Sequence, residues 1–167
     1  MINRPGTVAA MEQQRHMRRI AMTVDEVDAF LAGQRTCRVA TVGANGPHAT
    51  PLWFVWHGGA LWLTSLARSR RWADLRRDPR VAVVVDAGER YAELRGVELT
   101  GRVEIVGEVP RVGEPVAELD ETERLFADKY AGGVMEHDGR HGWLRLVPEK
   151  VVSWDFRKLP DSAQRYR

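Results

Sequence analysis

The fold is decided by one stretch of the chain, Leu63-Thr64-Ser65-Leu66-Ala67-Arg68-Ser69-Arg70-Arg71-Trp72-Ala73-Asp74-Leu75-Arg76-Arg77-Asp78-Pro79, and by the apolar run Val81 to Val85 that follows it. This stretch predicts a strand that ends at Thr64 and Ser65, a short polar loop, a helix that stops at Asp78-Pro79, and another strand. Ser69 stands where an N-cap belongs, because its hydroxyl can accept a hydrogen bond from an amide of the first helical turn.

Groups suited to an anion gather at the start of this predicted helix. A helix start offers free N–H donors and the positive end of the helix dipole. Arg70 and Arg71 add guanidinium groups that can bind a phosphate or carboxylate through two hydrogen bonds, and Thr64, Ser65 and Ser69 add hydroxyls. Arginines on a short amphipathic helix often form only a solvated face, so the local pattern leaves a phosphate site and a plain surface helix both open.

A second informative stretch is the predicted strand His48-Ala-Thr-Pro-Leu-Trp-Phe-Val-Trp-His57. Side chains alternate along a strand, so Leu52 lies on one face while Pro51 and Trp53 lie on the other, and both faces are apolar. One face can fill a barrel interior, and the other needs a helix, a partner subunit or a ligand to cover it. Pro51 cannot donate to a ladder and therefore indicates an edge or a bulge. Core packing and ligand contact both remain open for Trp53 and Trp56.

The remaining elements predict a mainly β protein with flanking helices. A capping box at Thr23-Val-Asp-Glu26 begins a helix that Gly33 closes. Further strands are expected over residues 38–42, 60–65, 81–86 and 91–106, and glycines at 96 and 101 suit the bends of a small barrel. A second helix is expected to begin near Pro115, and a final hairpin is expected from residues 142–147 and 151–156.

Several other polar residues and the single cysteine are expected to have structural roles only. Asp120, Glu121 and Glu123 are expected on the wet face of the second helix. The cluster His137, Asp138 and His141 lies among glycines and predicts a loop, not a metal site. The single Cys37 excludes an intrachain disulfide and is expected in the core.

The composition restricts the class of protein. A chain of 167 residues is expected to form one domain, and a net charge of +2 without a basic block does not indicate nucleic-acid binding. No apolar stretch is long enough to span a bilayer and no signal peptide opens the chain, so a cytoplasmic protein without membrane contact is expected. Of the 25 basic residues 22 are arginine, which suggests a high-GC source such as an actinobacterium.

The segments Thr64-Ser65, Ser69-Arg70-Arg71 and Leu75-Arg-Arg-Asp-Pro-Arg-Val-Ala82 resemble the phosphate-binding segment of the pyridoxamine 5'-phosphate oxidase-like superfamily, whose members bind FMN or the deazaflavin F420. The resemblance covers roughly residues 23–157. It implies a six-stranded antiparallel split β-barrel of the FMN-binding type, with residues 1–22 as an N-terminal arm and 158–167 as a tail. In that family a serine and a lysine or arginine two residues later hold the cofactor phosphate, and Ser69 and Arg71 match this pair.

The resemblance also implies a function: an F420-dependent oxidoreductase that transfers a hydride between the cofactor and a small organic substrate. It implies a homodimer with the cofactor at the interface, and a strand along the cofactor ring at residues 50–53. Neither the resemblance nor the sequence assigns a catalytic side chain. The cofactor-binding residues expected on this basis are Thr50, Pro51, Leu52, Trp53, Thr64, Ser65, Ser69, Arg70 and Arg71.

Three alternatives stay open. FMN could replace F420, although the arginines at 68, 70, 76 and 77 favour the deazaflavin because its glutamyl tail is polyanionic. A non-catalytic flavin- or haem-binding protein of the same fold is the second, with His48 or His57 as an axial ligand of haem. A pyridoxamine 5'-phosphate oxidase proper is the weakest, since the tail Arg165-Tyr-Arg167 lacks the histidine of that enzyme's Arg-x-His pattern.

Overall fold

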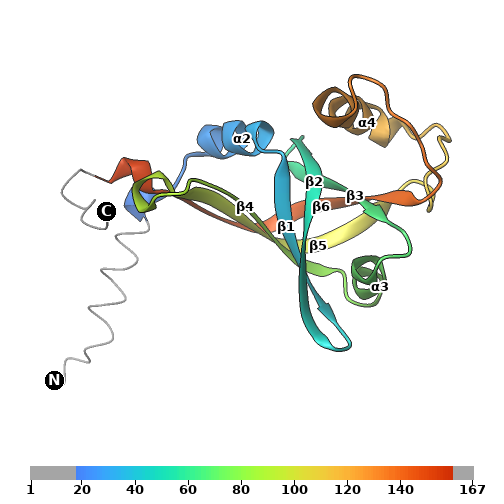
Figure 1. Cartoon of the computed structure of the whole chain (residues 1–167), viewed down its shortest axis with the longest axis horizontal. Helices are drawn as coiled ribbons and strands as arrows, with labels where there is room; N and C mark the ends of the chain where they lie inside the picture. Colours follow the sequence, from blue (N-terminus) through green and yellow to red (C-terminus); the bar gives the residue numbers. More distant parts are fainter. Residues whose placement is uncertain (1–17, 160–167) are drawn as a thin grey trace.

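The structure is a computed structural model that describes residues 18–159, and its six strands close into a barrel (Figure 1). The strands follow one another around the barrel in the order β1-β2-β3-β6-β5-β4, and every neighbouring pair is antiparallel. The prediction of a six-stranded antiparallel split barrel is therefore confirmed. The strands are β1 Thr36–Gly43, β2 Gly46–His57, β3 Ala60–Leu66, β4 Arg80–Ala87, β5 Arg95–Val106 and β6 His141–Asp155.

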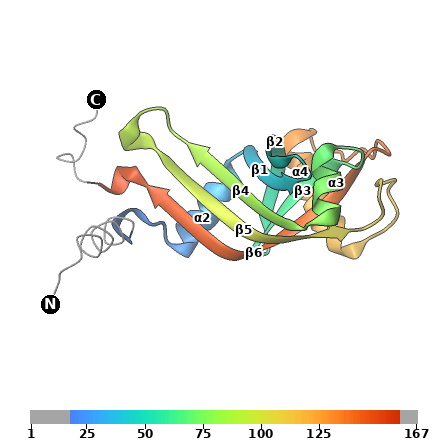
Figure 2. The ribbon, with the colours of Figure 1, turned by 90° about the horizontal axis from the view of Figure 1, so that it is seen from below.

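Three helices cover the barrel from different sides (Figure 1). They are α2 Val24–Gly33, α3 Arg70–Arg77 and α4 Ala117–Tyr130, and two short 3₁₀ turns, η1 Tyr91–Glu93 and η2 Phe156–Lys158, stand at strand ends. The capping box of α2 forms as expected: the Thr23 hydroxyl accepts from the Glu26 amide, and the Glu26 carboxylate accepts from the Thr23 amide at 2.7 Å. Seen from below, β4, β5 and β6 run side by side well beyond the barrel (Figure 2).

Two apolar clusters stabilise this arrangement. The inner one fills the barrel and includes Cys37, which is fully buried as predicted, together with Phe54 and Leu63. The outer one lies between the barrel wall and α4 and includes Trp62, Phe126 and Trp143. The two apolar faces of β2 are explained in this way, since Phe54 points into the barrel while Val55 packs in the outer cluster.

The first half of β2 forms a hairpin with β1 that extends away from the barrel (Figure 1). Residues 46–53 of β2 pair with β1, whereas pairing with β3 begins only at Phe54. Pro51 therefore lies on a free edge, as its missing N–H predicts. This edge leaves one side of the strand open beside the helix α3.

Three element predictions are wrong. The strand expected over residues 91–106 begins only at Arg95, because residues 91–93 form the 3₁₀ turn η1. Residues 142–156 do not form a hairpin: β6 is one continuous strand, and Glu149 is an extra residue between Pro148, which pairs with Gly101, and Lys150, which pairs with Thr100. Pro-Glu-Lys indicated a turn because turns and β-bulges favour the same residues. The helix α4 begins at Ala117 and not near Pro115, because Val116 is its N-cap residue.

The expectations for the ends of the chain lie mostly outside the described residues, which exclude 1–17 and 160–167. The last part of the predicted arm is described. Ile20 is fully buried, and the Met22 amide donates to the Ser153 hydroxyl at 3.0 Å. Among residues 18–159, no helix is both long enough and apolar enough to cross a membrane.

Candidate functional site

Arg71 is the centre of the predicted anion site, and it lies in a buried corner between α3, β2 and β3. Only 7% of its surface is exposed. Its guanidinium donates to the Ser65 hydroxyl, at 3.4 Å from Nε and 3.3 Å from Nη2, and also donates to the Thr50 hydroxyl. The structure thus brings together three of the predicted residues, which come from three different elements.

No carboxylate within the described part of the chain forms an ion pair with Arg71. Burial lowers the pKa of its guanidinium below the ordinary value. A buried charge without a counterion is costly, and hydroxyl groups compensate for it only in part. An anion that entered this corner would supply the missing charge and would find two hydroxyls and a guanidinium already in place. These groups therefore have the chemistry that binds a phosphate group.

The start of α3 is formed as the sequence predicts. The Ser69 hydroxyl accepts from the Trp72 amide at 3.2 Å, which fixes the first turn of the helix. Arg70 is exposed and lies 3.9 Å from the buried carboxylate of Asp74, so its charge is partly satisfied within the helix. Ser69 also borders a cavity of about 540 Å³ into which the start of α3 opens, together with Arg68 and Arg140.

The predicted residues of β2 do not share one surface. Leu52 and Thr50 belong to the inner face, and Leu52 packs against the barrel core. Trp53 lies on the outer face, is 52% exposed, and stacks on Tyr130 with ring centroids 4.7 Å apart. Alternation along a strand separates neighbouring side chains in this way. Trp56 is the more structural of the two tryptophans, since it packs against the core and its indole donates to Asp28 at 2.8 Å.

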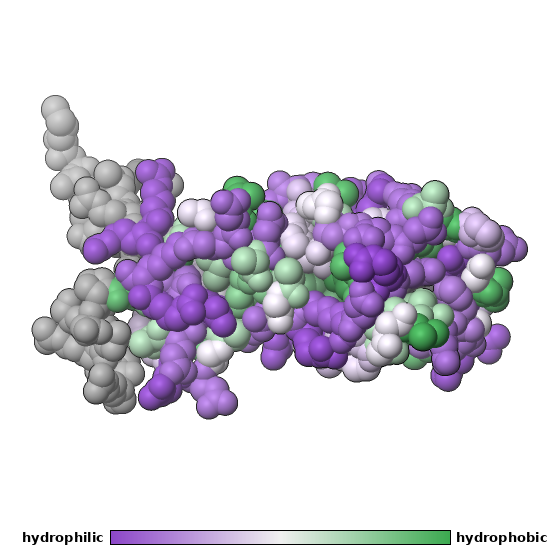
Figure 3. Space-filling view, turned by 90° about the horizontal axis from the view of Figure 1, so that it is seen from above, coloured by the Kyte–Doolittle hydropathy of each residue, from purple (hydrophilic) through white to green (hydrophobic). Residues whose placement is uncertain are grey.

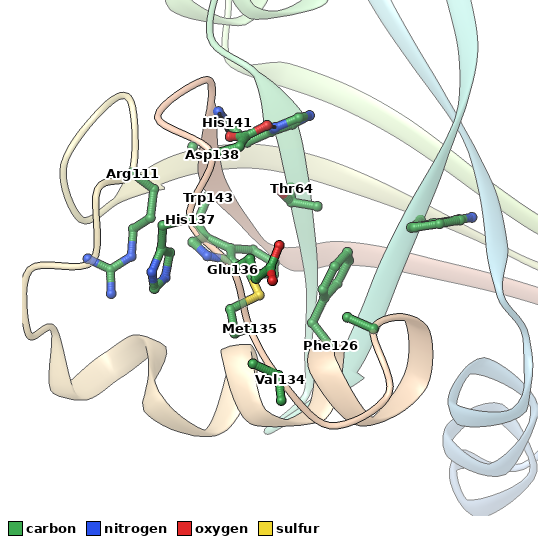
Figure 4. A pocket seen from close by; sticks show the side chains of 13 residues that line it. Thr64, Arg111, Phe126, Val134, Met135, Glu136, His137, Asp138, His141 and Trp143 are labelled. Atoms are coloured by element: carbon green, nitrogen blue, oxygen red, sulfur yellow. Dashed lines mark hydrogen bonds and ion pairs between the residues drawn. The ribbon is translucent and has the colours of Figure 1, made fainter.

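Trp53 and Thr64 both line a pocket on the outer face, with a volume of about 480 Å³ (Figure 4). Its apolar floor is formed by Phe126 and Trp143, whose rings meet edge to face at 5.4 Å. The outer rim comes from the segment that follows α4, over residues 131–142. The predicted loop is confirmed at His137 and Asp138, which line the pocket, whereas His141 is the first residue of β6.

A buried polar network holds this wall in place, and its centre is Glu123. The Glu123 carboxylate accepts from Arg111 at 2.7 Å, from the Trp143 indole at 3.0 Å, and contacts His137 Nε2 at 3.1 Å. Burial alone would raise the pKa of Glu123, but these hydrogen bonds outweigh it and lower the pKa. The prediction that Glu123 lies on the wet face of its helix is therefore wrong. Helical spacing placed it beside Asp120 and Glu121 but could not show that Arg111, from a preceding loop, would pack against it.

Arg111 is bound on its other side by Glu108, whose carboxylate accepts from Arg111 Nη1 at 2.6 Å. Glu108 also accepts from the amides of Val112, Gly113 and Glu114, each at 3.0 Å, so it folds the segment before α4 into a tight loop. The sequence alone predicts neither this network nor most of the outer pocket. The signal available was a set of charged residues in a loop rich in glycine, which is also typical of an ordinary solvated loop.

The two histidines considered as axial ligands differ in their surroundings. His57 Nε2 lies 2.7 Å from the Thr122 hydroxyl, and its ring stacks on Trp62 with centroids 5.4 Å apart. His48 lies on the protruding hairpin, where its Nδ1 is buried without a hydrogen-bond partner among the residues described.

Comparisons with known proteins agree on one family. A family model described as pyridoxamine 5'-phosphate oxidase matches residues 23–155. The chain is similar to the structure of the conserved hypothetical protein Rv2991 from Mycobacterium tuberculosis, with 32% identity, a TM-score of 0.72, and coverage of 84% of this chain and 91% of that one. A comparison with curated proteins found no match.

Two more distant structures share the fold. The haem storage protein HutZ from Vibrio cholerae is 16% identical, with a TM-score of 0.61 and coverage of 78% of this chain and 94% of that one. A structure described as F420 reductase is 23% identical, with a TM-score of 0.55 and coverage of 74% of this chain and 94% of that one.

Proposed function

Because this chain belongs to the pyridoxamine 5'-phosphate oxidase-like family of FMN- and F420-binding split barrels, we propose that it is an F420-dependent oxidoreductase acting on a small organic substrate. Family members bind flavins, F420 or haem. The observation that carries the proposal is the buried Arg71 guanidinium, which has two hydroxyl partners and no counterion in the described chain.

The residues of the corner would bind the cofactor phosphate. Arg71 would supply the charge, and the hydroxyls of Ser65 and Thr50 orient its guanidinium. Ser69 holds the helix start, so that the free amides of the first turn keep their direction. When bound, F420 supplies a ring that accepts or donates a hydride.

Trp53 would border the reacting end of the cofactor, as the family resemblance implies for residues 50–53, and Thr64 lines the same outer pocket. Phe126 and Trp143, which are 8% and 1% exposed, make the floor of that pocket apolar and exclude water from it. We assign no side chain to proton transfer. Binding, orientation and exclusion of water are the roles left to the protein.

The phosphate site is tested by titrating the purified protein with F420 and following the fluorescence of the cofactor. Arg71→Ala is expected to raise the dissociation constant by about tenfold or more, because a charge-assisted hydrogen bond contributes roughly 1.5–3 kcal/mol. Arg102→Ala, which removes an exposed arginine of β5, is the matched control and should bind as the unaltered protein does. Unchanged binding by the Arg71 variant would contradict the proposed site.

F420 is preferred to FMN because of the cavity beside Ser69. Arg68 and Arg140 line this cavity, and neither side chain forms an ion pair with a carboxylate of residues 18–159. Two free guanidinium groups suit the polyanionic glutamyl tail of F420, whereas FMN has no such tail. The double variant Arg68→Ala/Arg140→Ala should therefore weaken F420 binding and leave FMN binding unchanged. Equal weakening of both cofactors, or tighter binding of FMN by the unaltered protein, would favour the FMN enzyme.

Haem is a second candidate, and His48 is the observation that favours it. Its buried Nδ1 without a partner is the kind of atom that an axial bond would satisfy. Addition of haem would then produce a Soret band that His48→Ala abolishes, while neither F420 nor FMN would bind. A band that survives this substitution would exclude His48 as the ligand.

We further propose a homodimer. An apolar groove with a volume of about 890 Å³ runs between α2 and β6, lined by Met22, Val24, Trp56, Val147 and Val151 among others. Three of its valines are unusually exposed: Val24 by 77%, Val147 by 57% and Val151 by 47%. A second copy of the chain would cover them. The family resemblance implies a homodimer with the cofactor at its interface, whereas none of the predicted cofactor-binding residues lines this groove. Hydrophobic side chains also form patches among hydrophilic ones on the face shown in Figure 3.

A further inference from the structure

The outer pocket has a charge that the cofactor proposal does not explain. Its walls are aromatic, yet its lining includes the carboxylates of Glu136 and Asp138. The cation in the lining, Arg111, is already bound by the two carboxylates of Glu108 and Glu123. Around this apolar space the negative charges therefore outnumber the positive ones.

The two carboxylates of the lining are in different states. Asp138 is engaged within its own loop, where it accepts from the Arg140 amide at 2.9 Å and contacts His141 Nδ1 at 2.7 Å. Glu136 forms no ion pair or hydrogen bond with any residue of the described chain. Glu136 is exposed and is part of the pocket lining, and Figure 4 shows it beside Met135 on the segment that follows α4.

Three aromatic rings of the pocket lining pack against one another in a row. Phe126 lies between the other two rings, at 5.4 Å from Trp143 and 6.3 Å from Trp53. The faces of such rings carry partial negative charge and attract organic cations, most strongly where water is excluded. The Glu136 carboxylate, in the lining of the same pocket, adds the full negative charge that an ammonium group requires.

We propose that the outer pocket binds an organic cation with an apolar body, such as an aromatic or alkyl amine in its protonated or quaternary form. Glu136 pairs with the ammonium group, while Phe126, Trp143 and Trp53 contact the apolar part. The pocket volume of about 480 Å³ fits a molecule of this size. That this cation is the substrate rests on the proposed function, because Trp53 borders both the pocket and the expected cofactor ring.

The proposal is tested on the protein without added cofactor, so that its outcome does not depend on F420 binding. Three probes of similar size are titrated and followed by calorimetry: benzyltrimethylammonium, neutral benzyl alcohol and anionic benzenesulfonate. The cation should bind at least about fivefold more tightly than the neutral probe, and the anion should bind most weakly. Equal binding of all three, or no binding of the cation, would overturn the proposal.

Glu136→Gln keeps the shape of the side chain and removes its charge. It should weaken the cation by about fivefold or more and leave benzyl alcohol unchanged. Glu149→Gln, the same change at an exposed residue of β6 outside the pocket, is the control and should have no effect. If both variants bind the cation as the unaltered protein does, Glu136 does not recognise it. A separate titration with F420 then shows whether the cofactor proposal still stands.

Discussion

The carboxylate of Glu123 holds together segments that are far apart in the sequence. It binds Arg111 from the loop before α4, His137 from the loop after it, and Trp143 from β6. Each contact is short, and the Glu123 side chain is only 13% exposed. One residue therefore determines the shape of the outer pocket, although it does not line it.

We expect Glu123→Gln to lower the free energy of unfolding by about 2–3 kcal/mol, because the buried Arg111 would lose one of its two counterions. Urea unfolding at neutral pH measures this. Glu121→Gln on the same helix is the control: its pair with Arg124 is more than half exposed on both sides, so the loss should be below about 1 kcal/mol.

The loss of stability caused by Glu123→Gln should depend on pH. Folding lowers the pKa of Glu123 from its ordinary value of 4.5, so the carboxylate stabilises the fold above pH 4.5. This contribution is lost as the pH falls through the lowered value in the folded protein. The stability difference between the unaltered protein and the glutamine variant should therefore be full at pH 7 and shrink below pH 4.5. A difference that stays constant into acid would contradict this role.

Close approach between strands depends on Gly96 in β5. A methyl group at this position would lie 2.4 Å from the Trp154 indole of the neighbouring β6 and 2.9 Å from the Val85 carbonyl of β4. Neither group can move freely. The Val85 carbonyl belongs to the ladder between β4 and β5, and the Trp154 indole belongs to β6. Gly96 is therefore required for the packing of Trp154 near the ends of β4, β5 and β6, whereas the expected bend for barrel closure stays a prediction at this residue.

Gly96→Ala should accordingly lower the free energy of unfolding by about 1–3 kcal/mol, since the added methyl overpacks the sheet. Gly33→Ala at the end of α2 is the matched control. Nothing lies within 4 Å of an added methyl group there, so little change is expected. Thermal unfolding followed by circular dichroism measures both. A Gly96 variant as stable as the control would show that Trp154 repacks without cost.

Local signals predicted some elements well and others poorly. The capping box at Thr23 and the N-cap at Ser69 were recognisable because the groups that satisfy each helix end lie within three residues of it. The continuity of β6 was not recognisable, since Pro148-Glu149-Lys150 is typical of a turn and only the pairing with β5 shows that Glu149 forms a bulge. The residues of the candidate site were likewise recognisable from the sequence, but their positions were not. Only the closed sheet shows that Thr50 and Ser65 meet Arg71 on one face of the barrel wall while Trp53 and Thr64 lie on the other.

The proposed homodimer, with the groove between α2 and β6 as its interface, can be tested by substitution. Val151→Asp would place a charge in the groove, where a partner subunit would have to desolvate it. We expect this variant to shift the protein from dimer to monomer in size-exclusion chromatography with light scattering. Val112→Asp, at a valine that is 62% exposed but outside the groove, should leave the dimer intact. Identical masses for both variants would mean that the groove is not the interface.

The unbroken course of β6 restricts how the length of this protein can change. His141 and Trp143 near its beginning line the outer pocket, while Val147 and Val151 further along line the groove. A single residue inserted or deleted between them would turn every later side chain to the opposite face of the sheet. The bulge at Glu149 is the place in β6 where the strand already accommodates one extra residue. The loops on either side of α4 have no strand register, but Arg111 and His137 bind both loops to Glu123, so a change in their length would alter the outer pocket without shifting the barrel.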